Sequence, residues 1–203
     1  MSRSDLEDVK KFYNDRYRVQ GDSIGSVGWT SMESQHLRFD MLLRSIDVKD
    51  KTILDVGCGL GDLILFLEKR GFEFSYIGID ISSGLIKASK KKYHKHANVQ
   101  FFETDMLGFE VKKTNIDIAL LSGTLTYKMK DNLSYAKAVL TKMYQTANEV
   151  TVANFMSSYV DFINEKNHHY GPEEMFTFAK GLTKKVNIFH DYPLYEFTIQ
   201  IFK

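Results

Sequence analysis

Three glycines stand at alternate positions directly after a short apolar run, in ILDVGCGLGD at residues 53–62. Gly57, Gly59 and Gly61 allow the backbone to turn tightly and to approach a ligand without a Cβ in the way. The stretch holds no lysine and lacks the Gly-Lys-Ser/Thr of a phosphate-binding loop. It also lacks the last glycine of the dinucleotide fingerprint, because Asp62 stands there. An anion is poorly accommodated between the acids that flank this loop.

Two further carboxylates follow the next two apolar runs. Asp80 ends FSYIGID, about twenty residues after the glycine loop, where an acid can accept both hydroxyls of a ribose. Asp105 in ETDML can take the amino group of an adenine, and Met106 offers apolar cover. A nucleoside without phosphates fits both acids and the glycine loop.

These side chains are expected at one edge of a sheet, because short apolar runs alternate with amphipathic helical patterns. The expected strands are 52–56, 74–80, 99–103, 116–122 and 149–155, and the expected helices are 60–70, 83–95 and 132–147. Such alternation predicts a parallel sheet with both faces covered and with ligands outside the carboxyl ends of its strands. The tail KKVNIFHDYPLYEFTIQIFK holds two β-rich runs whose connection is too short for a crossover helix. The predicted fold is therefore α/β, a Rossmann-like doubly wound sheet of seven strands, mostly parallel with an antiparallel last strand.

Four segments, LDVGCGLGD, IGIDIS, ETDML and DIALLSGTL, resemble in order and spacing the class I S-adenosylmethionine-dependent methyltransferases, over roughly residues 50–203. The resemblance implies S-adenosyl-L-methionine as the cofactor and S-adenosyl-L-homocysteine as its product. It places Asp80 on the ribose, Asp105 on the adenine and Ser122 beside the methionine and the substrate. The cofactor contacts expected in this core are Asp55, Gly57, Cys58, Gly59, Asp80, Ile81, Asp105, Met106 and Ser122.

Each of these signals also has a purely structural explanation. The glycine loop by itself can be a tight turn, and an acid after a strand, such as Asp105, is often a helix cap. Cys58 fits the loop as a small residue rather than as a nucleophile, since no histidine lies near it in the sequence and no second cysteine accompanies it.

The N-terminal segment, residues 1–49, is expected to form a helical lid that contributes to the cofactor and substrate site. A helix is expected at 4–17, then a glycine- and serine-rich loop without regular structure, then a second helix capped by Thr30 or Ser31. Together with a catalytic core at 50–203 this segment forms one domain, 1–203.

Two residues of the lid are assigned to the site. Trp29, the only tryptophan, follows the loop, whose D-S-x-x-S-V-G-W pattern is similar to the lead-in of some small methyltransferases. Arg38 needs a partner if it lies near an apolar face. The alternative is that Trp29 merely packs the segment on the sheet, with Tyr13 and Tyr17.

The candidates for general-base catalysis lie near the C-terminus. His190 precedes Asp191 where the last hairpin turns over the ligand edge, and a histidine beside a carboxylate can remove a proton. The alternative is a turn in which Asp191 and Pro193 serve backbone geometry. His169 belongs to the long polar connection SSYVDFINEKNHHYGPEE, a type of segment that often carries binding groups.

The composition of the chain limits the classes of molecule that it is expected to bind. The net charge of +1 over 203 residues gives no broad basic footprint, so nucleic acid is disfavoured. One cysteine, a start without a signal-peptide core and the lack of a span-length apolar run predict a cytoplasmic protein without a membrane partner. The sequence shows no metal-ligand cluster, and the chain is expected to be a monomer or a homodimer.

The resemblance favours transfer of a methyl group to an oxygen or nitrogen of a small-molecule acceptor by in-line displacement. One alternative is a regulatory or scaffolding protein that binds the cofactor without catalysis, and another is an RNA or protein methyltransferase. A third, aminopropyl transfer, would require an acidic channel for a polyamine, and the acids of the sequence are not clustered in that way. LSGT at 121–124 replaces the N/D-P-P-Y/F of enzymes that methylate amino groups of bases, which disfavours that reaction.

Overall fold

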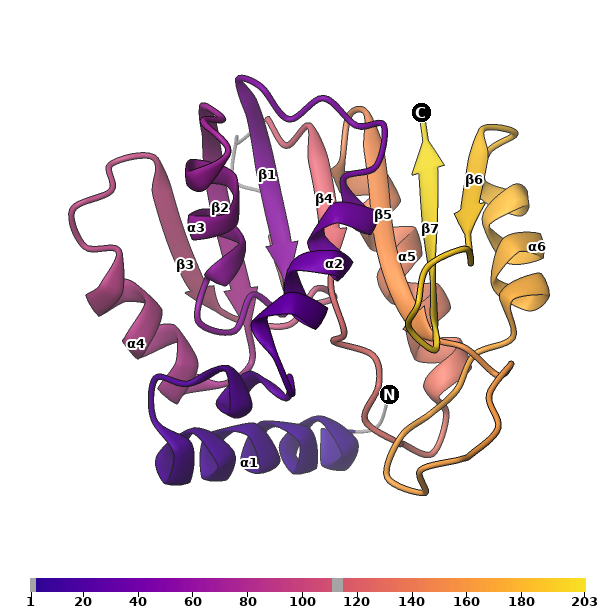
Figure 1. Cartoon of the computed structure of the whole chain (residues 1–203), viewed down its shortest axis with the longest axis horizontal. Helices are drawn as coiled ribbons and strands as arrows, with labels where there is room; N and C mark the ends of the chain where they lie inside the picture. Colours follow the sequence, from indigo (N-terminus) through magenta and orange to yellow (C-terminus); the bar gives the residue numbers. More distant parts are fainter. Residues whose placement is uncertain (1–2, 111–114) are drawn as a thin grey trace.

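The computed structural model describes residues 3–110 and 115–203, in which a central sheet carries helices on both faces (Figure 1). Its seven strands follow the order β3-β2-β1-β4-β5-β7-β6. They are β1 Lys51–Val56, β2 Phe74–Asp80, β3 Val99–Glu103, β4 Ile118–Leu121, β5 Val150–Met156, β6 Val186–Phe189 and β7 Glu196–Phe202. Only β7 pairs antiparallel, with β5 on one side and β6 on the other. The predicted seven-stranded sheet with an antiparallel last strand is confirmed.

The strand order reverses beside β1. The chain first moves outward from β1 to β2 and β3, and then returns to place β4 on the other side of β1. In Figure 1 the arrowhead of β1 points to the lower edge of the sheet, and the first helix runs across that edge. Ligands of open α/β sheets bind outside the carboxyl ends of the strands at such a reversal.

The helices divide between the two faces. They are α1 Arg3–Gln20, α2 Met32–Leu42, α3 Asp62–Lys69, α4 Ser83–Lys92, α5 Asn132–Thr146 and α6 Pro172–Leu182, with the short 3-10 helix η1 Ile24–Val27. Successive strand residues point to opposite faces, so Leu54 joins an apolar cluster with α5 and α6, whereas Ile53 joins one with α2, α3 and α4. Both residues are fully buried. Each face of the sheet therefore has its own core.

Side chains at the helix starts explain where several helices begin. The Ser31 hydroxyl accepts the N–H of Ser34 at 3.1 Å at the start of α2, as one of the two predicted caps. Ser82 and Asp131 cap α4 and α5 in the same way. These caps fix the ends of helices that start at the ligand edge.

Two segments differ from the sequence expectation. The helix α6 begins at Pro172, inside the stretch that the sequence analysis treats as a connection. Proline suits the first helical position. Met175 and Ala179, one turn apart, are fully buried and give the helix an apolar face. The loop expected to lack regular structure contains η1, and α1 extends to Gln20. Arg16 Nε donates to the Gly25 carbonyl oxygen, which ties η1 to α1.

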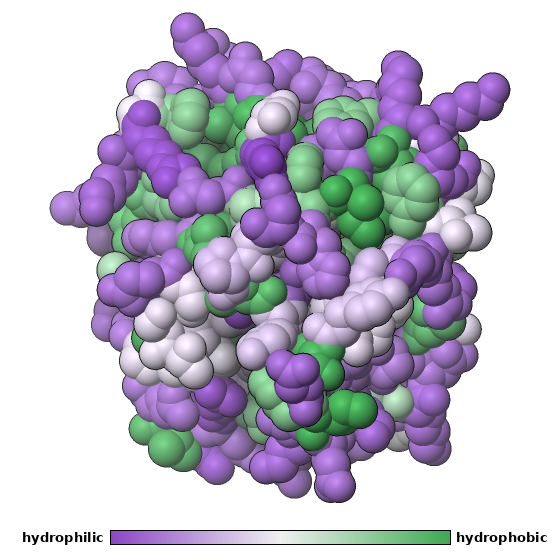
Figure 2. Space-filling view, turned by 45° about the vertical axis from the view of Figure 1, so that its right-hand side comes forward, coloured by the Kyte–Doolittle hydropathy of each residue, from purple (hydrophilic) through white to green (hydrophobic). Residues whose placement is uncertain are grey.

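The surface of the molecule is mixed in character. Figure 2 shows a face on which hydrophilic residues predominate and hydrophobic residues gather in small patches. Among the helices described, none is long and apolar enough to cross a membrane.

Candidate functional site

A cleft lies at the carboxyl ends of β1, β2 and β4, beneath α1 and η1. The volume of the cleft is about 1100 Å³, which includes space open to solvent. The sequence-predicted residues that line it are Asp55, Gly57, Cys58, Gly59, Asp80, Ile81, Asp105, Met106, Ser122 and Trp29. Of the predicted cofactor contacts, only Arg38 does not line this cleft. Residues that are far apart in the sequence thus meet at one place.

The glycine loop is a tight turn packed against its neighbours. Gly57 has φ +74° and Gly59 has φ +55°, both in the left-handed region. A Cβ on Gly57 would collide with Thr124, and one on Gly59 would lie 2.6 Å from Val27 Cγ1 of η1. The loop is anchored by the Ile79 carbonyl, which accepts the Gly57 N–H at 2.8 Å. The tight-turn explanation of these glycines therefore holds, and their close approach to a ligand stays a prediction.

Asp80 connects the end of β2 to the glycine loop. Its Oδ2 accepts the Gly59 N–H at 3.0 Å and its Oδ1 accepts the Ser82 N–H at 2.8 Å. Burial raises the pKa of Asp80, and these backbone donors oppose the shift. Each carboxylate oxygen retains a further lone pair, so Asp80 can still accept hydroxyls of a ligand in the cleft.

We expect Asp80→Ala to weaken S-adenosylhomocysteine binding by about tenfold or more, because charge-assisted hydrogen bonds to the loop and the ligand are lost together. Isothermal calorimetry measures the change. Asp117 is a matched control, since its carboxylate also accepts a backbone N–H, that of Thr52 at 2.8 Å, and Asp117 does not line the cleft. Asp117→Ala should lower the melting temperature and leave the affinity unchanged. Equal affinity of Asp80→Ala and the wild type would contradict this role.

Asp55 is a buried acid in the wall of the cleft. Tyr76 Oη donates to Asp55 Oδ2 at 2.6 Å. Burial, assisted by the negative charges of Asp80 and Asp62, raises the pKa of Asp55 to about 7 against the lowering effect of the tyrosine hydrogen bond. A cationic ligand in the cleft would favour the ionised carboxylate.

Ser122 and Asp105 present different polar groups to the cleft. The Ser122 hydroxyl oxygen is buried and has no hydrogen-bond partner among the described residues. A buried hydroxyl without a partner is costly, so this group fits a polar atom of a ligand beside β4. Asp105 Oδ1 accepts the Gly108 N–H at 2.6 Å within a turn at which no described helix begins, so Asp105 is not the helix cap of the alternative explanation, and the same residue lines the cleft. Its contact with adenine stays a prediction.

Cys58 is buried in the loop, and burial raises the pKa of its thiol. A thiol with a raised pKa is a poor nucleophile at neutral pH. This agrees with its interpretation as a small loop residue.

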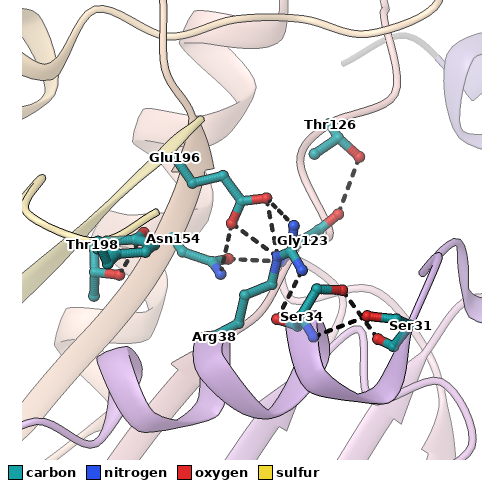
Figure 3. A network of polar contacts seen from close by, with 9 residues as sticks. Ser31, Ser34, Arg38, Gly123, Thr126, Asn154, Glu196 and Thr198 are labelled. Atoms are coloured by element: carbon teal, nitrogen blue, oxygen red, sulfur yellow. Dashed lines mark hydrogen bonds and ion pairs between the residues drawn. The ribbon is translucent and has the colours of Figure 1, made fainter. Parts of the chain in front are cut away.

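Arg38 contacts Trp29 rather than lining the cleft itself. Its Nε donates to both carboxylate oxygens of Glu196 at 2.9 Å, in a buried salt bridge (Figure 3). Its guanidinium carbon lies 4.1 Å from the centroid of the Trp29 ring. Arg38 thus has the partner that the sequence required, and it acts on the cleft through Trp29.

The three predicted catalytic residues are not among those that line the cleft. Asp191 is exposed and accepts both hydrogen bonds from Arg44 Nη1 at 2.8 Å, which lower its pKa, so its partner is Arg44. His190 is exposed, with its ring 5.9 Å from that of Tyr159. His169 Nδ1 lies 2.8 Å from the Ser157 carbonyl oxygen. A catalytic role for these residues stays a prediction.

Sequence reasoning missed several lining residues. Asp62 begins α3, and Tyr127, Met129 and Tyr135 come from the connection after β4 and from α5. The signal was available, because a connection that follows a parallel strand lies at the same edge as the other ligand loops. The lining includes four carboxylates, of Asp55, Asp62, Asp80 and Asp105, and within the described chain it includes no lysine, arginine or histidine.

The helix α1 lies over the cleft and contacts residues on both sides of the cleft. Asn14 Oδ1 accepts the Ser82 hydroxyl at 2.8 Å and the Gly84 N–H at 3.1 Å, and Lys10 pairs with Glu103 at 2.7 Å. On the other side, the rings of Phe12 and Tyr127 have centroids 5.2 Å apart.

Comparisons with curated proteins point to methyltransferases. A family model described as "Methyltransferase domain" matches residues 53–149. Rv1506c of Mycobacterium tuberculosis, a candidate methyltransferase, is 29% identical over 169 residues, which are 79% of this chain and 99% of that protein. The carboxy-S-adenosyl-L-methionine synthase of Campylobacter hominis is 32% identical over 47% of this chain. The chain spans 40% of that synthase, so less than half of its length.

Solved structures agree in fold. The magnesium protoporphyrin IX methyltransferase of Synechocystis PCC 6803, crystallised with S-adenosylhomocysteine, is 14% identical, with a TM-score of 0.69 over 98% of this chain and 99% of that one. The small RNA methyltransferase HEN1 is 17% identical, with a TM-score of 0.66 over 84% of this chain and 25% of that one. The glycine loop, the acids that follow β2 and β3 and the matched domain lead to one conclusion. The matched domain, the methyltransferase relatives and the fold support a class I S-adenosylmethionine-dependent methyltransferase.

Proposed function

We propose that this methyltransferase acts on an oxygen or nitrogen atom of a small acceptor that is uncharged or cationic. The observation that carries the proposal is that the described lining of the cleft has no cationic side chain that could pair with an anionic acceptor, whereas it has four acidic ones, three of which are predicted cofactor contacts. Electrostatic complementarity disfavours phosphates and carboxylates in such a site.

A small acceptor is favoured over a polymer by the way the cleft is enclosed. Val9 of α1 is buried, and Leu6 and Tyr13 of the same helix line the cleft. Nucleic-acid binding usually depends on cationic side chains that neutralise phosphates, and the net charge of the chain is only +1. RNA is therefore the less favoured acceptor, although one structural neighbour is an RNA methyltransferase.

The described residues fit the cofactor. S-adenosylmethionine supplies, when bound, a methyl group that its sulfonium has already activated. Asp80 and the glycine loop would hold its nucleoside, and Asp55 and Ser122 offer a carboxylate and an unpartnered hydroxyl to the amino-acid part. The contribution of the protein is to orient the two reactants and to exclude water.

The experiment is a titration followed by an acceptor screen. Calorimetry with S-adenosylmethionine and S-adenosylhomocysteine tests the cofactor, and release of S-adenosylhomocysteine then reports turnover. The panel contains phenols, alcohols and amines, the matching carboxylic and phosphorylated compounds, and short RNAs. Turnover confined to uncharged or cationic acceptors supports the proposal. Turnover only on anionic compounds or RNA overturns it, and cofactor binding without turnover on any acceptor favours the non-catalytic alternative.

A further inference from the structure

Trp29 is fixed against the end of β4. Gly123 follows β4 with φ +65°, and a Cβ there would collide with the six-membered ring of Trp29. The ring therefore sits directly on the backbone of Gly123. The next residue toward β4 is Ser122, whose hydroxyl oxygen has no partner among the described residues. Both Trp29 and Ser122 line the cleft.

A circuit of contacts returns from Gly123 to the indole through Arg38. The Gly123 N–H donates to Asn154 Oδ1 at 2.7 Å, and Asn154 Nδ2 donates to Glu196 Oε2 at 3.3 Å (Figure 3). Glu196 accepts from Arg38 Nε at 2.9 Å, and Arg38 stacks on Trp29 at 4.1 Å. The members come from five different parts of the chain, namely the segment before α2, α2 itself, β5, β7 and the turn after β4.

The members of this circuit are unusually buried for polar side chains. Arg38, Glu196 and Asn154 are 9%, 7% and 2% exposed. A buried salt bridge is weak evidence for stability, because apolar residues of similar volume often serve as well. Arginine does have a geometric property that lysine lacks, since its planar fork binds a carboxylate at two points while its flat face stacks on an aromatic ring. The arrangement therefore fits a positioning role.

The strand order indicates which part of the cleft Trp29 faces. Asp105, the predicted adenine contact, follows β3, and Asp80, the predicted ribose contact, ends β2. The sheet continues β3-β2-β1-β4. A cofactor that lies along this edge would place its methionine part near β1. The β4 end of the cleft, with Trp29, then remains for the acceptor.

We propose that Arg38, Glu196 and Asn154 are positioning residues that hold Trp29 as the acceptor-side wall of the cleft. The inference rests on the proposed function, because that function places an acceptor beside β4. A cation–π contact with Arg38 should increase the ratio of indole packed on Gly123 to indole displaced from it by about 5- to 30-fold. Trp29 is the only tryptophan, so its fluorescence reports this position in the protein without any ligand.

The test compares Arg38→Met and Arg38→Lys with the wild type. In both variants we expect emission shifted to the red and stronger quenching by acrylamide, because the indole leaves Gly123 more often. S-adenosylhomocysteine affinity should change far less than in Asp80→Ala. Arg70→Met is the matched control, since Arg70 also stacks on a ring, that of Phe66 at 3.8 Å, and pairs with Asp40. This variant should leave the emission of Trp29 unchanged.

The double variant Arg38→Met/Glu196→Met separates positioning from stability. It removes the buried carboxylate that the single variant leaves unpaired, so it should recover the melting temperature while the emission stays shifted. The inference would be overturned if the double variant recovered both the melting temperature and the emission of the wild type, or if the emission of Arg38→Met were unshifted. If the single variants do not fold, the double variant decides by the same readout.

Turnover provides a second readout once the screen has supplied an acceptor. A positioning role predicts a larger loss of kcat/KM for the acceptor than for S-adenosylmethionine. Equal losses for both substrates would show that Arg38 stabilises the fold as a whole and does not position Trp29 specifically. These fluorescence results are independent of the cofactor titration and the acceptor screen, so a failure of the proposed function is recognised separately.

Discussion

Gly57→Ala is expected to weaken S-adenosylhomocysteine binding by about 100-fold or more, which corresponds to about 2.8 kcal/mol. The left-handed backbone at φ +74° costs any side chain about 1–2 kcal/mol. In addition, the new Cβ would collide with Thr124, whose hydroxyl donates to the Val56 carbonyl oxygen at 3.0 Å. The loop must therefore move away from the position in which it meets the cofactor. Calorimetric titration of the purified variant measures the loss.

Gly71→Ala separates backbone strain from collision. Gly71 has the same φ of +74°, and a Cβ there meets no atom within 4 Å. This variant should lose stability, measured as a lower melting temperature, and keep the affinity of the wild type. Adding Thr124→Gly to Gly57→Ala should recover part of the binding, with Thr124→Gly alone as the reference. If both glycine variants bound equally well, the close approach at Gly57 would have no role in cofactor binding.

Asp55→Asn is expected to stabilise the protein above pH 7 and to weaken S-adenosylmethionine binding there by about tenfold, or 1.4 kcal/mol. The folded-state pKa of Asp55, about 7, lies above its ordinary value of 3.8. The folded protein therefore holds this proton more tightly than the unfolded chain does. Stability falls as the pH rises between these two values, and the full cost of the buried charge is present above the upper one.

Asparagine cannot ionise, and its carbonyl oxygen can still accept the Tyr76 hydroxyl. The gain in unfolding free energy is expected to be about 1–4 kcal/mol above pH 7, and to vanish below the ordinary pKa of an aspartate. Denaturant unfolding at several pH values measures it. A variant that is no more stable than the wild type at high pH would show that the buried carboxylate carries no such cost.

Cofactor binding should have the opposite dependence on pH. S-adenosylmethionine carries a sulfonium charge, so its affinity for the wild type should rise as Asp55 ionises near pH 7. Asp55→Asn should lose this rise. S-adenosylhomocysteine lacks the sulfonium but keeps the ammonium of the amino-acid part, so its affinity should rise with pH by a smaller factor. A rise that persists in Asp55→Asn would assign the effect to another group.

The sequence contained the cofactor half of the site because that half is built from local signals. The glycine loop, Asp80 and Asp105 each follow a strand, and a parallel sheet brings the carboxyl ends of its strands to one edge. The alternation of strands and helices was therefore sufficient to predict that these residues lie together, and in the structure all of them line the cleft.

The ion-pair partners of Arg38 and Asp191 could not be predicted from local sequence signals. Arg38 and Glu196 are 158 positions apart, and Arg44 and Asp191 are 147 apart. In the sequence His190 and Asp191 are neighbours, which suggested a catalytic pair. In the folded chain the carboxylate pairs with Arg44 instead, because the hairpin after β6 packs beside the end of α2.

The sequence by itself determined the class of fold, the direction of the last strand and the position of the glycine loop at the ligand edge, since each depends on periodicity or on one residue's backbone freedom. Only the tertiary structure decided which side chains wall the rest of the cleft and that Trp29 is held by a buried salt bridge from α2 to β7. Such contacts depend on distances between elements that no local pattern encodes.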